Sequence, residues 1–388
     1  MRGKSLILIV LGMMLLASCR RSTFNPGKNP PPGPQYDPRN ISRTDSTQSS
    51  GPCITIGPDG TVYVAWMDGS RTGYDPFRIY FRYKPPGGDW SDIEILSDSL
   101  HNAWRPHIAA DPFGNVHLVW DAHIPGNTDY RIYYRMRDTS GEWSSTMVLS
   151  NEGIASQAHI GVDPLGVVHV IWIQGFGMKY RIRAVNGSWS GIEAVPVGRQ
   201  GSVNPDMEVD VNGGVHIVYE GHRNIKYIYR FPSGEWTEPV VLADRDSPWI
   251  ASVILDNSGN PWVLWTINDW GVGWNTGIIC YTHLENGVWT EPDTIPGTRA
   301  GHAWPRGKSL YFYNGVKYLL WGDGYFDIFL GKTDGDLSEG VKVTMPFAPP
   351  GSPYPSSVLD RNGVLHVVWA ADRGDGNWEI FYDTLQLQ

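Results

Sequence analysis

The sequence predicts an all-β chain, a seven-bladed β-propeller of four-stranded antiparallel blades. Three observations predict it: a ten-residue motif that returns every 46–56 residues, almost no helical periodicity, and 18 Trp among 388 residues. A period of this size is typical of a solenoid, a propeller or an array. The seven copies of the motif close with an aromatic residue, at Trp66, Trp120, Trp172, Tyr219, Trp265, Trp321 and Trp369.

The second copy of the motif indicates how one repeat makes four strands. An apolar run at 106–110 is followed by the turn sequence Asp-Pro-Phe-Gly at 111–114, and then by the alternating, β-branched segment 116–120. A variable polar loop at 121–130 leads to a third strand at 131–135, and Gly141-Glu142-Trp143 predicts a second tight turn before a fourth strand that ends at 148–150. Four antiparallel strands per repeat is the pattern of a propeller blade. We therefore expect most tryptophans to pack between blades.

The last blade lacks a fourth strand of its own, because the seventh repeat stops at Gln388 just after its third strand. A closed ring leaves no exposed edge, so the missing strand must come from elsewhere. The segment 41–46 precedes Gly51-Pro52 much as 95–99 precedes Arg105-Pro106. We predict that residues near Asn40–Arg43 supply the outer strand of the last blade and close the ring.

The N-terminal segment predicts export. Residues 1–19 combine the basic Arg2 and Lys4, an apolar run too short to span a bilayer, and Leu16-Ala17-Ser18-Cys19, which resembles a bacterial lipobox. The resemblance implies lipidation of Cys19 and an anchor in the cell envelope, periplasmic or at the cell surface; the alternative is an ordinary signal peptide with an incidental Cys. Residues 20–39, rich in Pro, Gly and Asn, are expected to form a flexible tether, and 40–388 the propeller.

The composition of the chain limits which classes of molecule it is expected to bind. The net charge of −9 and the pI near 5.6 argue against nucleic acid, which needs a clustered basic surface. Cys53 and Cys280 lie in different blades, so we expect no disulfide between them. We also expect no cofactor, membrane contact only through the lipid anchor, and a monomer.

Alignment of the copies separates two columns of polar residues. The first column, three residues before the terminal aromatic, is occupied by Trp as readily as by His, so we interpret it as packing; it comprises Tyr63, His117, His169, His216, Trp262, Tyr318 and His366. The second column lies near the start of the innermost strands and differs in every blade, as expected where a ring reads one asymmetric ligand; the alternative is contact with channel water alone. Its members are Cys53, His107, His159, Asp206, Ser252 and Ser356, with Arg306 or Lys308 in the sixth blade.

One face of the ring should carry the function. The loops after the terminal aromatics and those that feed the innermost strands open on the same side, opposite the tight turns; we call this side the loop face. Candidate ligand-binding residues on it and in the second column are Arg105, His107, His159, Asp206, Trp270, Trp304, Arg306 and Arg373.

Two short constellations suggest chemistry on the loop face. Asp121-Ala122-His123 and Glu220-Gly221-His222 each place a carboxylate two residues from an imidazole, as a general base and acid acting on a sugar or uronate would require. Asp121 and Glu220 facing each other across the channel could instead hydrolyse a glycoside. The same set could hold a divalent metal, but no tight ligand spacing supports this, and no metal site is predicted.

The whole array, with its IYYR strand and Gly-x-Trp turn, resembles the bacterial propellers of the sialidase-like superfamily, which carry BNR-type repeats. The resemblance runs from about residue 40 to the end, and it implies a site at the loop-face mouth of the channel and a carbohydrate ligand. The sialidase Asp-box survives only in decayed form at Asp138–Trp143, and no first-strand arginine motif is present. The arginine triad is therefore not carried over, and Arg105, Arg223, Arg306 and Arg373 are candidates by position only. Propeller polysaccharide lyases are similar in repeat and use His and Tyr, which implies roles for His123 and Tyr325.

Three functions remain open at this stage. The chain could bind glycan or protein through the loop face without catalysis. It could be a glycan-active enzyme, a glycoside hydrolase or a polysaccharide lyase. It could also be a scaffold that offers its rim to an envelope protein complex. A charged channel mouth would favour the enzyme, a ring of exposed aromatics the binding protein, and an exposed apolar patch the scaffold.

Overall fold

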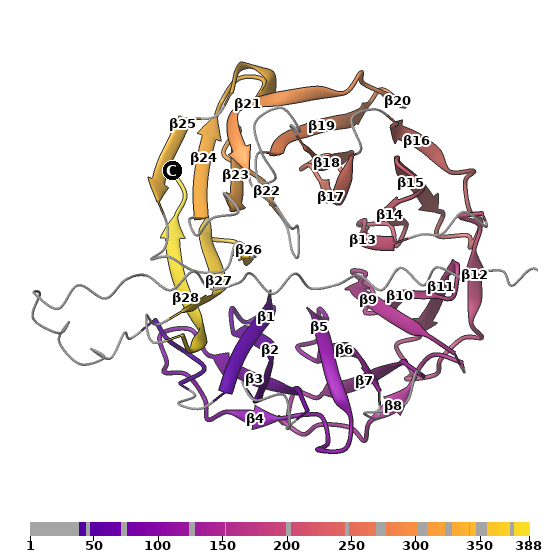
Figure 1. The fold of residues 1–388 in the computed structure, drawn as a ribbon, viewed down its shortest axis with the longest axis vertical. Coiled ribbons are helices and arrows are strands. Elements are labelled where there is room, and N and C mark those ends of the chain that lie inside the picture. Colours follow the sequence, from indigo (N-terminus) through magenta and orange to yellow (C-terminus); the bar gives the residue numbers. More distant parts are fainter. Residues whose placement is uncertain are drawn as a thin grey trace, which may run out of the picture. The chain divides into compact units, whose positions relative to one another are not determined.

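Seven antiparallel sheets follow one another around a common centre, and the innermost strand of each sheet lies nearest to that centre (Figure 1). The computed structural model describes residues 39–43, 47–70, 76–123, 129–151, 153–198, 203–244, 248–268, 277–300, 309–322, 328–340, 342–346, 355–372 and 376–388. The sheet order confirms the predicted seven-bladed propeller. Residues 37–388 form one compact unit.

Blades 1 to 4 each run outward through four strands. Blade 1 contains β1 (Thr47–Ile56), β2 (Val62–Ser70), β3 (Arg78–Lys84) and β4 (Glu94–Ile95), and blade 2 contains β5 (Asn102–Ala110), β6 (Val116–His123), β7 (Arg131–Arg137) and β8 (Met147–Val148). Blade 3 contains β9 (Ala155–Val162), β10 (Val168–Gln174), β11 (Gly177–Arg183) and β12 (Glu193–Val195), and blade 4 contains β13 (Val203–Val209), β14 (Val215–Glu220), β15 (Ile225–Arg230) and β16 (Val240–Ala243).

Blades 5 to 7 vary this plan. Blade 5 contains β17 (Trp249–Leu255), β18 (Pro261–Asn268), β19 (Gly277–Glu285), β20 (Val288–Trp289) and β21 (Asp293–Ala300), the last two both pairing with β19. Blade 6 contains β22 (Leu310–Tyr313), β23 (Val316–Gly322), β24 (Ile328–Thr333) and β25 (Lys342–Pro346), with the short 3₁₀ helix η1 (Leu337–Glu339) before β25. Blade 7 contains β26 (Ser356–Leu359), β27 (Val364–Asp372) and β28 (Trp378–Gln386).

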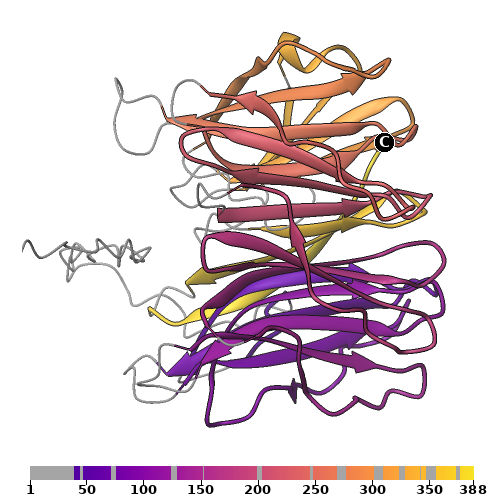
Figure 2. The same ribbon diagram turned by 90° about the vertical axis from the view of Figure 1, so that its right-hand side faces the viewer.

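The strands run between the two faces of the ring (Figure 2). Because neighbours are antiparallel, the connections β1–β2 and β3–β4 lie on one face, and β2–β3 and β4–β5 lie on the other. The second of these is the loop face. The sequence argument for two unlike faces therefore agrees with the strand order.

The first histidine column belongs to a repeated hydrogen-bond chain. In blade 2 the turn residue Asp111 accepts the backbone N–H groups of Phe113 and Asn115 at Oδ1, at 2.9 and 2.8 Å. Its Oδ2 lies 3.3 Å from Nε2 of His117, and Nδ1 of His117 lies 2.8 Å from the hydroxyl of Tyr134. The three side chains tie the inner turn to the third strand.

Blade 4 contains the same chain, as Asp210–His216–Tyr227. In blades 3 and 7 the imidazoles of His169 and His366 keep the hydrogen bond to the hydroxyls of Tyr180 and Tyr382, but their Nε2 atoms lie 3.8 Å from Oδ2 of Asp163 and Asp360. Burial lowers the pKa of His117, His216 and His366, which keeps these imidazoles neutral at neutral pH. All four histidines are buried, and their packing role is confirmed.

The tryptophans of the Gly-x-Trp turns join neighbouring blades. Each packs its ring edge against the third-strand aromatic of the preceding blade, with centroids 4.8–5.5 Å apart. The pairs are Trp143–Phe81, Trp189–Tyr134, Trp236–Tyr180, Trp289–Tyr227 and Trp90–Tyr382. The last pair joins blade 7 to blade 1, so the interblade contact continues across the closure of the ring.

The N-terminal residues complete blade 7. Ile41 donates its backbone N–H to the carbonyl of Ile380 at 2.8 Å, Tyr382 donates to the carbonyl of Arg39 at 2.9 Å, and the hydroxyl of Ser42 accepts the N–H of Ile380 at 2.8 Å. The side chain of Ile41 is fully buried. The predicted closure by residues near Asn40–Arg43 is confirmed.

Blade 1 contains the same contacts between its outer segment and its third strand. They correct the residue-by-residue match that the sequence suggested between 41–46 and 95–99. Leu96 donates to the carbonyl of Ile79 at 2.8 Å, and the hydroxyl of Ser97 accepts the N–H of Ile79 at 2.9 Å. Ile41-Ser42 is therefore equivalent to Leu96-Ser97, whereas the sequence alignment matched Ile41 with Ile95. The error arose because both residues are apolar, and only the hydrogen-bond partner distinguishes the inward residue from its exposed neighbour.

The predictions for the N-terminal segment concern residues that the structure does not describe. Cys19 and the whole of residues 1–38 lie outside the described residues. Among the residues that the structure describes, no helix has the length and apolar character needed to cross a membrane. Within the same ranges Cys53 and Cys280 are buried in different blades and form no disulfide.

Candidate functional site

Five consecutive innermost strands bend at the same place near the loop face. The register of β1, β5, β9, β13 and β17 against the second strand of each blade shifts there, as in a β-bulge. One residue in each bend has a positive φ of 48–57°, namely Gly51, Arg105, Gln157, Asn204 and Ile250. Glycine adopts this conformation readily, but a β-branched residue such as Ile rarely does. We call these five residues the bulge residues.

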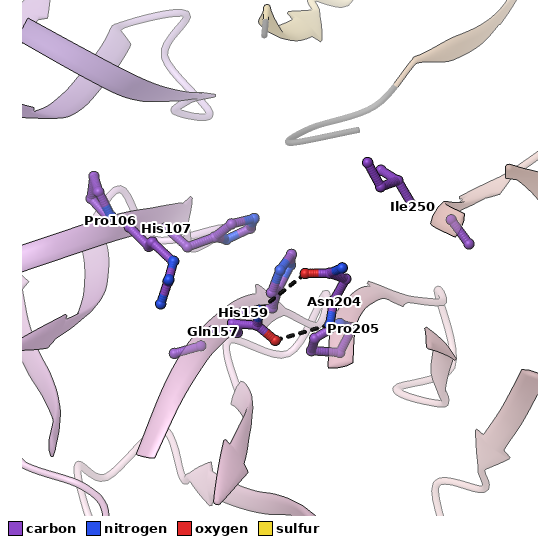
Figure 3. A pocket seen from close by; sticks show the side chains of 10 residues that line it. Pro106, His107, Gln157, His159, Asn204, Pro205 and Ile250 are labelled. Carbon is purple, nitrogen blue, oxygen red and sulfur yellow. Dashed lines mark hydrogen bonds between the residues drawn. The ribbon is translucent and has the colours of Figure 1, made fainter. Parts of the chain in front are cut away.

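A pocket lies against four of the bulge residues (Figure 3). Its volume is about 60 Å³, and its walls come from blades 2 to 5. The lining consists of Arg105, Pro106, His107, Gln157, Ala158, His159, Asn204, Pro205, Ile250 and Ala251. Two members of the variable second column, His107 and His159, are thus in the wall.

Second-column residues of blades 2 to 4 form one row. The imidazole rings of His107 and His159 have centroids 4.5 Å apart and planes inclined at 38°. Nδ1 of His159 lies 3.3 Å from Oδ1 of Asp206, whose Oδ2 accepts the backbone N–H of Val253 at 3.0 Å. The row therefore continues from blade 2 to the backbone of blade 5.

The bulge residues form a second row beside the first. The side chain of Gln157 donates to Oδ1 of Asn204 at 3.0 Å, and the backbone N–H of Asn204 donates back to Oε1 of Gln157 at 2.9 Å (Figure 3). Asn204 also donates from Nδ2 to Oε1 of Glu220 at 3.1 Å, and the same oxygen accepts the N–H of Ile250. These reciprocal bonds fix the orientation of both amides.

Glu220 is half-buried and contacts the amide pair through Asn204. Burial raises the pKa of its carboxyl, and the hydrogen bonds from Ile250 and Asn204 oppose this only in part. A carboxyl that is reluctant to ionise can exchange a proton closer to neutral pH than an exposed one.

Asp121 and His123 have different partners although they are two residues apart. Asp121 is 1% exposed and accepts a hydrogen bond from the guanidinium of Arg105 at 3.0 Å. The ring of His123 stacks on Tyr130, with centroids 4.3 Å apart and planes inclined at 29°. Burial, and then the charge of His101, lower the pKa of His123, so it is a neutral imidazole at neutral pH.

The structure thus brings together six of the predicted site residues around one pocket: Arg105, His107, His159, Asp206, Asp121 and Glu220. His222 is exposed in the turn between β14 and β15, and His123 lies in its own aromatic stack. Tyr325, Trp270, Trp304, Arg306 and Arg373 lie outside the described residues. Among the described residues, no group of three or more His, Cys, Asp or Glu side chains is placed to hold a metal ion.

Sequence reasoning missed Gln157, Asn204 and Ile250. A signal for them was present, because each stands two residues before the second column and is followed by Pro or Ala, as are Gly51 and Arg105. The recurring Pro or Ala indicates that the backbone bulge repeats from blade to blade. The residue before it varies, so each bulge places a different side chain at the pocket.

The pocket combines two kinds of chemistry. Oriented amides and a guanidinium offer hydrogen bonds to hydroxyl or carboxylate groups. The carboxylate of Asp206 lies beside Nδ1 of His159, so an acidic group and an imidazole, the two kinds of group used in proton transfer, stand next to each other at the pocket.

Comparison with known proteins finds similar folds among solved structures. No family model and no curated protein matches this sequence. Among solved structures, an ulvan lyase of polysaccharide lyase family PL25 superposes with a TM-score of 0.59 and 10% identity over 88% of this chain and 95% of the lyase. The K499G mutant of the NanB sialidase of Streptococcus pneumoniae gives a TM-score of 0.51 and 11% identity over 90% of this chain and 71% of the sialidase. The GH93 α-L-arabinofuranosidase of Fusarium graminearum gives 0.54 and 14% over 92% and 95%. At these identities the likeness establishes a shared propeller fold.

Proposed function

We propose that this protein is an exported, lipid-anchored propeller that recognises a glycan at the loop-face mouth of its channel. The observation that carries the proposal is the Gln157–Asn204 amide pair beside the imidazoles of His107 and His159, at bulges that differ in residue type from blade to blade. The three similar propellers named above, a lyase and two glycosidases, support a glycan as the ligand.

The polar lining suits a sugar. A sugar hydroxyl both donates and accepts, and it needs partners held at fixed angles in a site where water is excluded. The amides of Gln157 and Asn204 are held by each other, and the guanidinium of Arg105 is held by the buried Asp121. Such preorganisation reduces the entropy that binding must overcome.

A glycan-active enzyme is the second candidate. It is favoured by Asp206 beside His159, which lines the pocket, and by Glu220, which has a raised pKa and contacts the pocket residue Asn204. Asp121 and His123 contribute to this alternative only through separate contacts, with Arg105 and Tyr130.

A scaffold for an envelope protein is the third candidate. Exposed apolar side chains lie at the inner turns of three consecutive blades on the face opposite the pocket, namely Phe113, Leu165 and Val211. Apolar side chains gathered on one surface mark a protein contact more often than isolated ones do.

Glycan retention tests the first proposal. Residues 20–388, which contain the compact unit, would be run by affinity electrophoresis through gels containing polygalacturonate, alginate, chondroitin sulfate or xylan. We expect retardation by at least one polymer and an approximately tenfold or greater loss in Asn204→Gly, which removes the amide but tolerates the positive φ.

The control is Asn314→Gly. Asn314 also has a positive φ, of 50°, but it lies in an exposed turn of blade 6 on the opposite face. Equal retention of the wild type and of Asn204→Gly would rule out the pocket as the glycan site.

The enzyme alternative is separated by product analysis. Reducing ends report hydrolysis, and absorbance of an unsaturated uronate reports elimination. Release of either product, lost in His159→Gln and Asp206→Asn while binding is kept, would establish catalysis. Retention without product across the four polymers would leave a binding protein.

The anchor has its own test. Incorporation of labelled palmitate by cells expressing the full chain, lost in Cys19→Ser, is expected for a lipoprotein. Export and cleavage without lipid incorporation would mean an ordinary signal peptide.

A further inference from the structure

The pocket is small, with a volume of about 60 Å³. A glycan chain that places one sugar residue or one of its substituents there must continue outside the pocket, against the loop face.

The loop face is uneven around the pocket. In blade 3 only Gly175 and Phe176 stand between the end of β10 at Gln174 and the start of β11 at Gly177. The equivalent connections are longer in blades 1, 2 and 5, where they separate Ser70 from Arg78, His123 from Arg131 and Asn268 from Gly277. The shortest connection thus belongs to the blade that supplies Gln157 and His159.

This short turn presents an aromatic ring to solvent. Phe176 is 82% exposed, the highest value among the large apolar side chains of the described residues. Gly175 has a φ of 62° and Phe176 has no positive φ, which is the pattern of a two-residue hairpin turn of type II′. Its N–H donates to the carbonyl of Ile154 at 3.1 Å, which fastens the turn to the segment that enters β9.

The turn that carries Phe176 is hydrogen-bonded to the residue that precedes β9, and β9 also carries the pocket residue Gln157. Ile154, itself 58% exposed, immediately precedes β9, and Gln157 of the pocket lies three residues further along. At about 3.3 Å per residue these positions are roughly 10 Å apart, within the reach of a short oligosaccharide. Ile154 and Phe176 thus lie at the loop-face end of the segment of blade 3 that supplies Gln157 to the pocket.

We propose that Phe176, supported by Ile154, forms an outer subsite that stacks against a sugar residue of the same glycan chain whose neighbour occupies the pocket. The ligand is therefore an oligosaccharide or polysaccharide and not a free monosaccharide. The inference rests on the proposed glycan function and adds chain length to it. The C–H face of a pyranose covers aromatic surface that would otherwise remain in water, which is the source of the affinity.

The test compares chain lengths. Galacturonate, alginate, chondroitin sulfate and xylan fragments, graded from monosaccharide to octasaccharide, would be titrated into residues 20–388 by isothermal calorimetry. We expect affinity to rise with length in the wild type, and Phe176→Ala to lose about tenfold for the long fragments but little for the shortest ones. Phe176→Trp should keep the length dependence.

The matched control is Leu165→Ala. Leu165 is 72% exposed at the turn that precedes β10, so it lies at the opposite end of the same strand from Phe176. Removing it deletes a similar amount of exposed apolar surface on the face away from the pocket, and binding of every fragment should be unchanged.

The outcomes separate the two proposals. Binding that depends on Asn204 but whose length dependence survives Phe176→Ala overturns the outer subsite and leaves the pocket as the glycan site. Equal loss of affinity for all lengths in Phe176→Ala also overturns it, because the ring would then act through the fold or the pocket. Absence of binding by all four fragment series and their polymers removes both proposals.

Discussion

The two columns that contain histidines both recur in the repeat, but their histidines differ in burial and in partners. His117, His169, His216 and His366 are buried between a turn Asp and a Tyr hydroxyl, with the same partners in each of their four blades. His107 and His159 stand on the innermost strands, where the equivalent residue in the next blade is Asp206 and in the one after that Ser252. A residue type that recurs with its partners indicates a structural role, whereas residue types that vary on a recurring backbone are what the proposed recognition site requires.

The largest expected effect lies on the structural side of this comparison. Ile41→Ala should lower the free energy of unfolding by about 2–4 kcal/mol, because Ile41 is fully buried where the ring closes. Denaturant unfolding followed by tryptophan fluorescence measures this. The control is Ile95→Ala, which alters the exposed residue next to the equivalent Leu96 and should change stability by under about 0.5 kcal/mol. A larger effect at Ile95 would restore the register that the sequence alignment suggested.

Substitutions of intermediate expected effect compare one histidine from each column, His216 and His107. His216→Phe leaves the buried hydroxyl of Tyr227 and Oδ2 of Asp210 without the imidazole, and this should cost about 1–3 kcal/mol of stability without altering glycan retention. His107→Phe should do the reverse, with stability changed by under about 1 kcal/mol and retention weakened. If the two variants give the same pair of results, the distinction between the columns is wrong.

The most gradual effect is on pH dependence. The folded-state pKa values of His117, His216 and His366 are lowered by burial, so these residues favour folding fully above the unfolded value of about 6.5 and lose this contribution as the pH falls towards the folded values. The unfolding free energy should decline between about pH 6.5 and 5, by at most about 1.4 kcal/mol per pH unit for each histidine. Chemical denaturation across this range measures the slope, which should be shallower in His366→Gln. A stability that rises over the same interval would contradict the lowered pKa values.

Much of the fold could be predicted from the sequence because a propeller repeats its local rules. The Asp-x-x-Gly turns, the alternating strands and the Gly-x-Trp turns each determine structure within a few residues, and seven copies average out local exceptions. The closure by Ile41 was predictable for the same reason, since one strand was missing. The packing role of His216 followed from Trp262 in the same column.

The site was only partly predictable because it depends on contacts between blades. Nothing local indicates that Asp121 turns to Arg105 while His123 stacks on Tyr130. The positive φ of Asn204 and Gln157 is a property of the bend, and residue type alone does not reveal it. The reach of Glu220 to the backbone of Ile250 likewise depends on how two blades meet.

The closure of blade 7 has a consequence for the order of events during synthesis. Ser42 and its partner Ile380 are separated by 338 positions, so the first propeller residues to be made find their partner only when almost the entire chain is complete. Contacts of such long range are slow to form and carry a large loop-closure entropy. The other blades can assemble from local contacts, but the outer edge of β28 in blade 7 stays open to other chains until this last pairing is made. The interval before the pairing is therefore the period of greatest exposure to aggregation.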